Sequence, residues 1–146
     1  DCLLSRGLGD VYKRQQVLAE CRRVLKDEGR FLCSTYGKQH MWEITDLVQK
    51  FHKEIVLSAE VLYERFGLEN GENLLAPYFP EIQMRRYEDA IEIAEAEPLI
   101  SYILSCHGNQ NQLLLNQYKE FREFVSARVA DGFHITKDAG IFLCRK

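Results

Sequence analysis

The residues best suited to chemistry stand together, in a short polar stretch that directly follows an apolar run. The stretch offers hydroxyl groups, an imidazole and a thioether, which can bind a small molecule by hydrogen bonds and packing. An imidazole can also take up a proton near neutral pH. We therefore expect a substrate to bind at five residues: Ser34, Thr35, Tyr36, His40 and Met41. The catalytic residue stays unassigned, because the sequence shows neither a Ser–His–Asp set nor an obvious carboxylate pair.

Several candidates also have ordinary structural interpretations. His40 could act as a base or a hydrogen-bond partner, or it could be a solvated histidine at the start of a helix. Tyr36 could line a pocket or fill space at the rim of the core. Glu69-Asn70-Gly71 could form a pocket loop or a turn that caps a helix. The sequence leaves these alternatives open.

The sequence does not indicate a metal site. His52, His107 and His134 fall on separate expected elements, whereas a metal needs ligands that converge. The five cysteines, at positions 2, 21, 33, 106 and 144, contain no Cys-x-x-Cys pair. We expect them to behave as small apolar residues, with no bound metal and no disulfide framework.

One stretch, Val17 to Gly37, organises the elements expected around the candidate site. Its apolar residues recur with helical spacing, and Gly29 is expected to end this helix in the left-handed conformation. Arg30–Thr35 then predicts a short strand covered on both faces, because its apolar run is nearly continuous. Ligands of open parallel sheets bind beyond the carboxyl ends of the strands. The polar exit after this strand is therefore the expected edge of a pocket.

The rest of the chain shows further helical and strand patterns. Glu54–Phe66 fits either a short helix capped by Ser58 or a strand, and the sequence does not decide between them. The tripeptide Asp138-Ala139-Gly140 predicts a turn between two strands. The other expected elements are helices at 39–53, 71–76, 98–107 and 110–131, and strands at 82–93 (with a bulge near 88–89), 133–137 and 141–144.

Composition and charge argue against several functional classes. The 146 residues are 46% hydrophobic and 28% charged with a net charge of −3, whereas a nucleic-acid surface is normally basic. No apolar run reaches the roughly 20 residues of a membrane span, and no secretory signal opens the sequence. We expect a cytoplasmic protein whose partner is a small-molecule substrate rather than a nucleic acid or a membrane. The sequence does not indicate an oligomeric state.

Residues 1–15 fit the rest of the chain poorly. Their sequence, DCLLSRGLGDVYKRQ, resembles a translated sequencing-adaptor remnant. Gly7-Leu8-Gly9 is weak evidence for a phosphate loop, since no apolar strand precedes it and the later glycine is missing. We therefore treat 1–15 as a non-native segment, although its tail can extend the next helix.

A series of motifs, in order, gives the sequence a family resemblance. Residues 23–31, RVLKDEGRF, resemble the helix and fifth strand of class I S-adenosylmethionine-dependent methyltransferases, with Asp27-Glu28 where Pro-Gly is usual. Later motifs are similar to small-molecule methyltransferases of the type-11 kind. These are FGLENG (66–71), YEDAI (87–91), PLISYI (98–103) and KDAGIF (137–142). The resemblance covers roughly residues 16–146.

The resemblance implies an α/β fold, namely part of a Rossmann-like methyltransferase domain with a helical insertion on the substrate side. Arg30–Thr35, Ile82–Ile93 and Ile141–Arg145 would be strands five, six and seven of a mixed sheet, in the order 5-7-6. In that family the first half of the domain holds S-adenosylmethionine. The resemblance thus implies that residues 16–146 are the C-terminal part of a single domain.

Several functional expectations follow from this resemblance. The chain would have no cofactor-binding residue of its own, since the S-adenosylmethionine motifs would lie upstream. The implied activity is methyl transfer to a small molecule, and the isolated chain is expected to be inactive. The alternative is a non-enzymatic α/β interaction module that shares the late-Rossmann pattern.

Overall fold

The computed structural model describes residues 11–58 and 61–146. Residues 1–10, which include the Gly7-Leu8-Gly9 segment, lie outside the described ranges. The chain divides into two compact units. The sheet unit comprises Asp1–His40, Val61–Glu88 and Asp138–Lys146, and the helical unit comprises Met41–Glu60 and Asp89–Lys137. Each unit is described by itself.

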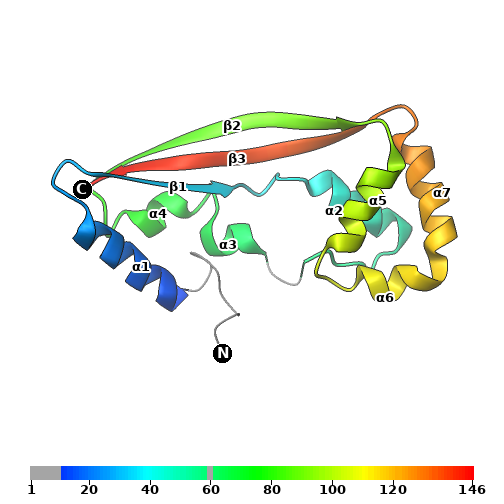
Figure 1. Cartoon of the computed structure of the whole chain (residues 1–146), viewed down its shortest axis with the longest axis horizontal. Helices are drawn as coiled ribbons and strands as arrows, with labels where there is room; N and C mark the ends of the chain where they lie inside the picture. The colour runs from blue at the N-terminus through cyan, green and yellow to red at the C-terminus, as the bar shows by residue number, and fades with distance from the viewer. Residues whose placement is uncertain (1–10, 59–60) are drawn as a thin grey trace. The chain divides into compact units, whose positions relative to one another are not determined.

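The described strands form one sheet in which the last strand of the chain lies in the middle. β1 (Arg30–Tyr36), β3 (Phe133–Arg145) and β2 (Glu81–Ile93) follow in the order β1-β3-β2. β1 pairs antiparallel with β3, with Arg30 opposite Arg145 and Tyr36 opposite Ala139. The arrows of β2 and β3 also run in opposite directions (Figure 1). The expected order is confirmed, whereas the expected mixed sheet is wrong, because both neighbouring pairs of the described sheet are antiparallel.

β3 runs without interruption through the tripeptide that predicted a turn. The glycine of that tripeptide serves close packing instead. A Cβ on Gly140 would lie 2.7 Å from the Arg85 carbonyl oxygen and 2.8 Å from Leu68 Cδ2. The pairs Glu81–Arg145 and Glu92–His134 follow one register along β2 and β3. The bulge expected near residues 88–89 is therefore wrong.

The helix before β1 buries fewer of its apolar side chains than the helical spacing predicted. α1 (Val11–Val24) buries Leu18, whereas Val17 and Val24 are exposed. The residue in the left-handed conformation after this helix is Glu28, with φ 64°, and not Gly29. Gly29 has no space for a side chain, because a Cβ there would lie 2.6 Å from the Lys26 carbonyl oxygen.

The sheet unit packs one face of β1 and leaves the other open. Phe31 stacks on Phe79, with ring centroids 5.2 Å apart and planes within 3°. Leu32, on the opposite face, keeps 59% of its surface exposed. The prediction that this strand is covered on both faces is therefore wrong for the described chain. The buried core of the unit consists of Leu18, Phe66, Leu68, Leu75, Phe79, Phe142 and Cys144.

Two short helices cover this core, α3 (Leu62–Phe66) and α4 (Gly71–Leu75). Asn70 holds the N-cap position of α4, as expected, but its side chain does not cap the helix. Its Oδ1 accepts a hydrogen bond from the Gly67 amide at 2.7 Å, and its Nδ2 donates to two carbonyls of α3. Asn70 thus stabilises the loop between α3 and α4 through these hydrogen bonds. The ambiguous stretch before Phe66 ends as helix α3, with residues 59–60 outside the described ranges.

The helical unit surrounds an aliphatic and aromatic core. It contains α2 (Trp42–Phe51), α5 (Ala96–Ser105), α6 (Gln110–Leu114), the 3-10 turn η1 (Leu115–Gln117) and α7 (Tyr118–Val129). The single helix expected over 110–131 is wrong, because the chain tightens at η1 and leaves Leu115 exposed. The central residues are fully buried: Leu47, Val48, Ile55, Ile103, Phe121, Val125 and Ile135.

Candidate functional site

An open pocket of about 500 Å³ lies where β1 ends, within the sheet unit. Four of the five residues that the sequence singled out line it, namely Ser34, Thr35, Tyr36 and His40. The other lining residues are Tyr87 of β2 and Ala139, Gly140 and Ile141 of β3. The expected location at the polar exit of this strand thus coincides with a pocket in the structure.

Met41, the fifth predicted residue, is not part of this pocket. It belongs to the helical unit, where its sulfur lies 3.9 Å from the Tyr102 hydroxyl and 3.8 Å from Lys137 Nζ. Its backbone has φ 57°, which is unusual for a residue with a side chain. The Met41 amide donates a hydrogen bond to the Thr136 carbonyl at 2.8 Å. Met41 therefore begins α2 rather than lining the pocket.

The predicted site does not include the lining residues that come from the two other strands. Tyr87 belongs to the motif YEDAI, which predicted only a strand, and Asp138-Ala139-Gly140 predicted a turn. The strand order 5-7-6 was the signal that could have found them, because it brings β3 beside β1 and β2 beside β3.

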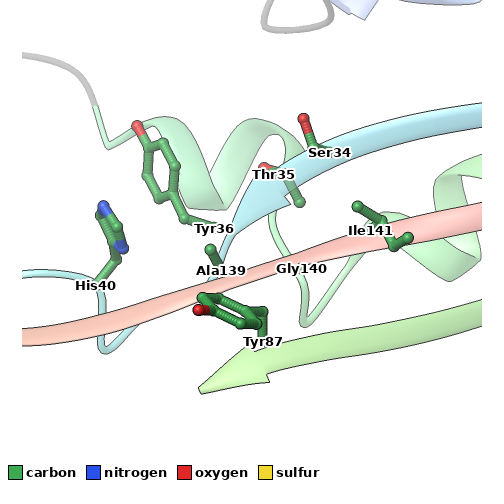
Figure 2. Close-up of a pocket in the computed structure, with 8 residues that line it drawn as sticks. All are labelled: Ser34, Thr35, Tyr36, His40, Tyr87, Ala139, Gly140 and Ile141. Carbon is green, nitrogen blue, oxygen red and sulfur yellow. The ribbon is translucent and has the colours of Figure 1, made fainter. Parts of the chain in front are cut away.

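Tyr36, Ala139 and Tyr87 form a row across the sheet. Tyr36 is paired with Ala139. On the other side, the Glu81–Arg145 pair fixes a register that brings Tyr87 opposite Ala139. Paired residues of neighbouring strands point to the same face. A small residue is thus flanked by two aromatic ones, and Figure 2 shows Tyr36 and Tyr87 on opposite sides of the β3 ribbon.

Tyr36 and His40 form one wall of the pocket. Their rings stack, with centroids 4.9 Å apart and planes at 22°. Burial raises the pKa of the Tyr36 phenol above its ordinary value of 10.0. The phenol therefore stays protonated at neutral pH and can donate a hydrogen bond to a ligand.

Of the other hydroxyl groups in the pocket, that of Thr35 has a structural role. Thr35 Oγ1 donates a hydrogen bond to the Phe66 carbonyl at 2.7 Å, which ties β1 to the end of α3. Ser34 is exposed and paired with Ile141 across the strands. Ser34 thus stands at the outer edge of the pocket, with its hydroxyl beside an apolar side chain.

A buried aspartate holds the loop that carries His40. Asp138 Oδ2 accepts a hydrogen bond from the Gln39 amide at 3.2 Å, and its Oδ1 lies 3.2 Å from Arg86 Nε. A Cβ on Gly37 would lie 2.2 Å from Asp138 Oδ2, so only glycine fits at this position. Because the carboxylate contacts both the loop and β2, it fixes the distance between the two sides of the pocket.

Glu69 strengthens the same loop from the outside. Its Oε1 accepts a hydrogen bond from the Lys38 amide at 3.1 Å and lies 3.2 Å from an Arg86 terminal nitrogen. Glu69 is not among the lining residues. Its observed contacts therefore stabilise the loop rather than bind a ligand.

Other potential sites give no additional chemistry within residues 11–58 and 61–146. In these ranges no group of three His, Cys, Asp or Glu residues could hold a metal ion. Of the histidines, His134 pairs with Glu92 in the helical unit, and this hydrogen bond raises the His134 pKa. None of the described helices is both long and apolar enough to cross a membrane.

Comparison with known proteins does not assign the chain. No protein-family model matches it, and no curated protein matches it either. The functional argument therefore depends on the geometry of the pocket and on the motifs of the sequence.

Proposed function

We propose that this chain is the substrate-side, C-terminal part of an S-adenosylmethionine-dependent methyltransferase that acts on a small molecule. The observation that carries the proposal is the strand order β1-β3-β2. The order matches the 5-7-6 arrangement that the motif resemblance implies, and β3 is antiparallel to β1. The pocket at the carboxyl end of β1 supports the same assignment, because open α/β sheets bind ligands there.

The turn between α1 and β1 gives independent support. Glu28 adopts φ 64°, a conformation that glycine adopts readily and other residues avoid. The resembling family usually has glycine at this position. The positive φ of Glu28 is thus compatible with the glycine of the family motif, although the residue differs.

The pocket residues suit methyl transfer to a neutral acceptor. In this reaction a lone pair of the acceptor forms a bond to the methyl carbon while the carbon–sulfur bond breaks. The electron pair of that bond stays on sulfur, which becomes a neutral thioether. Orientation of the two reactants can supply much of the rate enhancement. We assign Tyr36 the role of hydrogen-bond donor to the acceptor, and His40 that of recipient of the acceptor's proton.

The cofactor would bind to a part of the domain outside this chain. The proposal includes a cytoplasmic enzyme, since methyl acceptors of small size and S-adenosylmethionine are both soluble metabolites. The isolated chain would be inactive for lack of a cofactor site.

The test uses the longer protein encoded by the reading frame that contains this sequence. Calorimetric titration with S-adenosylhomocysteine should give micromolar binding. Tyr36→Phe should leave that affinity unchanged and lower the rate of methyl transfer, because the phenol contacts the acceptor and not the cofactor. Absence of S-adenosylhomocysteine binding would overturn the proposal and favour the non-enzymatic interaction module.

A further inference from the structure

We propose that the pocket binds a flat aromatic ring, which lies over Ala139 between Tyr36 and Tyr87. The inference rests on the proposed function only in identifying this ring as part of the methyl acceptor. The binding preference itself follows from the row of three residues across the sheet and can be tested without the cofactor.

The row has the right width for one ring. Neighbouring strands lie roughly 4.8 Å apart, so Tyr36 and Tyr87 start from backbones about 10 Å apart. A ring in van der Waals contact on both sides needs about 3.5–4 Å on each side. Ala139 lies between the two tyrosines in this row and carries only a methyl group.

The walls favour an aromatic ligand over a saturated one. Tyr36 stacks one face of its ring on His40, which leaves the other face for a ligand. Tyr87 is 64% exposed, and the described structure shows no hydrogen bond, ion pair or ring contact that holds it. An aromatic side chain left exposed beside a pocket gains contact area and favourable ring geometry when a flat ring inserts. Ile141 adds apolar surface at the edge.

The lining of the pocket offers hydrogen bonds rather than ion pairs to a ligand. None of its described lining residues is Asp, Glu, Lys or Arg. Hydrogen bonds from the hydroxyls of Tyr36 and Ser34 are available for a polar substituent of the ring.

The experiment is an NMR titration of the 146-residue chain, labelled with nitrogen-15, with two matched probes. 2-Naphthol is flat and aromatic, and decahydro-2-naphthol has the same carbon skeleton but no aromatic ring. We expect 2-naphthol to shift the amide signals of Tyr36, Ala139 and Gly140. It should bind about tenfold more tightly than the saturated probe.

Two variants test the row from different sides, with a matched control elsewhere. Tyr87→Ser removes an exposed wall, and Ala139→Val fills the floor with a residue that strands accept well. Each should weaken 2-naphthol binding about tenfold. Tyr118→Ser, which removes an exposed tyrosine from the helical unit, should leave the affinity for 2-naphthol unchanged.

Several outcomes would overturn the proposal: no binding of 2-naphthol, equal binding of the saturated probe, signal shifts outside the pocket, or unchanged affinity in both variants. The titration with 2-naphthol tests the aromatic site independently of methyl transfer. Binding of 2-naphthol without S-adenosylhomocysteine binding by the longer protein would refute methyl transfer and keep the aromatic site. The reverse pattern would refute the aromatic site alone.

Discussion

The sheet unit and the helical unit bury their residues in different ways. The helical unit surrounds its core, so that Phe121 and Val125 are inaccessible to solvent. The sheet unit packs one face of its strands and leaves Leu32, Tyr87 and Ile141 exposed on the other. The pocket lies on this open face. A sheet covered on one face thus leaves room for a ligand on the other. The closed helical core instead buries its apolar side chains, which stabilises the fold.

The largest expected difference between the two units is in the free energy of unfolding that is lost when one apolar side chain is removed from each. Phe121→Ala should lower the free energy of unfolding by about 3–5 kcal/mol, because it leaves a cavity in the closed core. Leu32→Ala should change it by no more than about 0.5 kcal/mol, since the side chain is mostly in solvent. Urea unfolding followed by circular dichroism measures both. A large effect of Leu32→Ala would show that this sheet face is covered.

The next effect concerns the carboxylate that holds the pocket loop. Asp138→Ala should lower the free energy of unfolding by about 1–3 kcal/mol, because the variant loses a buried hydrogen bond and an ion pair. Glu81→Ala is the control, since its pair with Arg145 joins two exposed side chains and is worth at most about 1 kcal/mol. The same urea unfolding experiment compares them. Equal effects would contradict the role assigned to Asp138.

A smaller effect separates the thiols of the two units at alkaline pH. Burial, with the nearby Cys144 and Cys21 thiols, raises the pKa of Cys33 to about 12. The unfolded chain ionises this thiol above pH 9, while the folded chain keeps its proton, so stability falls as pH rises from 9 towards 12. Cys33→Ala should make this fall shallower, and more so than Cys106→Ala in the helical unit. Unfolding in urea at a series of pH values measures the slopes, and identical slopes would be inconsistent with the raised pKa.

The smallest expected effect is a gain in stability at the turn before β1. Glu28→Gly should raise the free energy of unfolding by up to about 1 kcal/mol, because glycine adopts the observed positive φ without strain. Gly29→Ala is the matched control and should destabilise, since its Cβ would meet the Lys26 carbonyl oxygen. Thermal unfolding followed by circular dichroism would detect both changes. A loss of stability in Glu28→Gly would mean that its side chain stabilises the turn.

Local pattern was enough to predict much of the chain. Helical spacing predicted α2 within residues 39–53, and the polar exit of β1 predicted where the pocket begins. Helical spacing and a short apolar run are properties of neighbouring residues, so one sequence reveals them. The motif resemblance added the order of the strands, which no local pattern contains.

Tertiary structure decided the features that depend on partners distant in the sequence. Asp138-Ala139-Gly140 has the composition of a turn, yet it continues β3, because Ala139 and Gly140 pair with the end of β1. The helix expected over 110–131 is interrupted at η1, none of whose three residues is buried in the core. The position of Tyr87, the second wall of the pocket, also depends on the register between β2 and β3. Tyr87 faces Ala139 only once β2 and β3 are aligned, and such alignment is a property of the folded sheet.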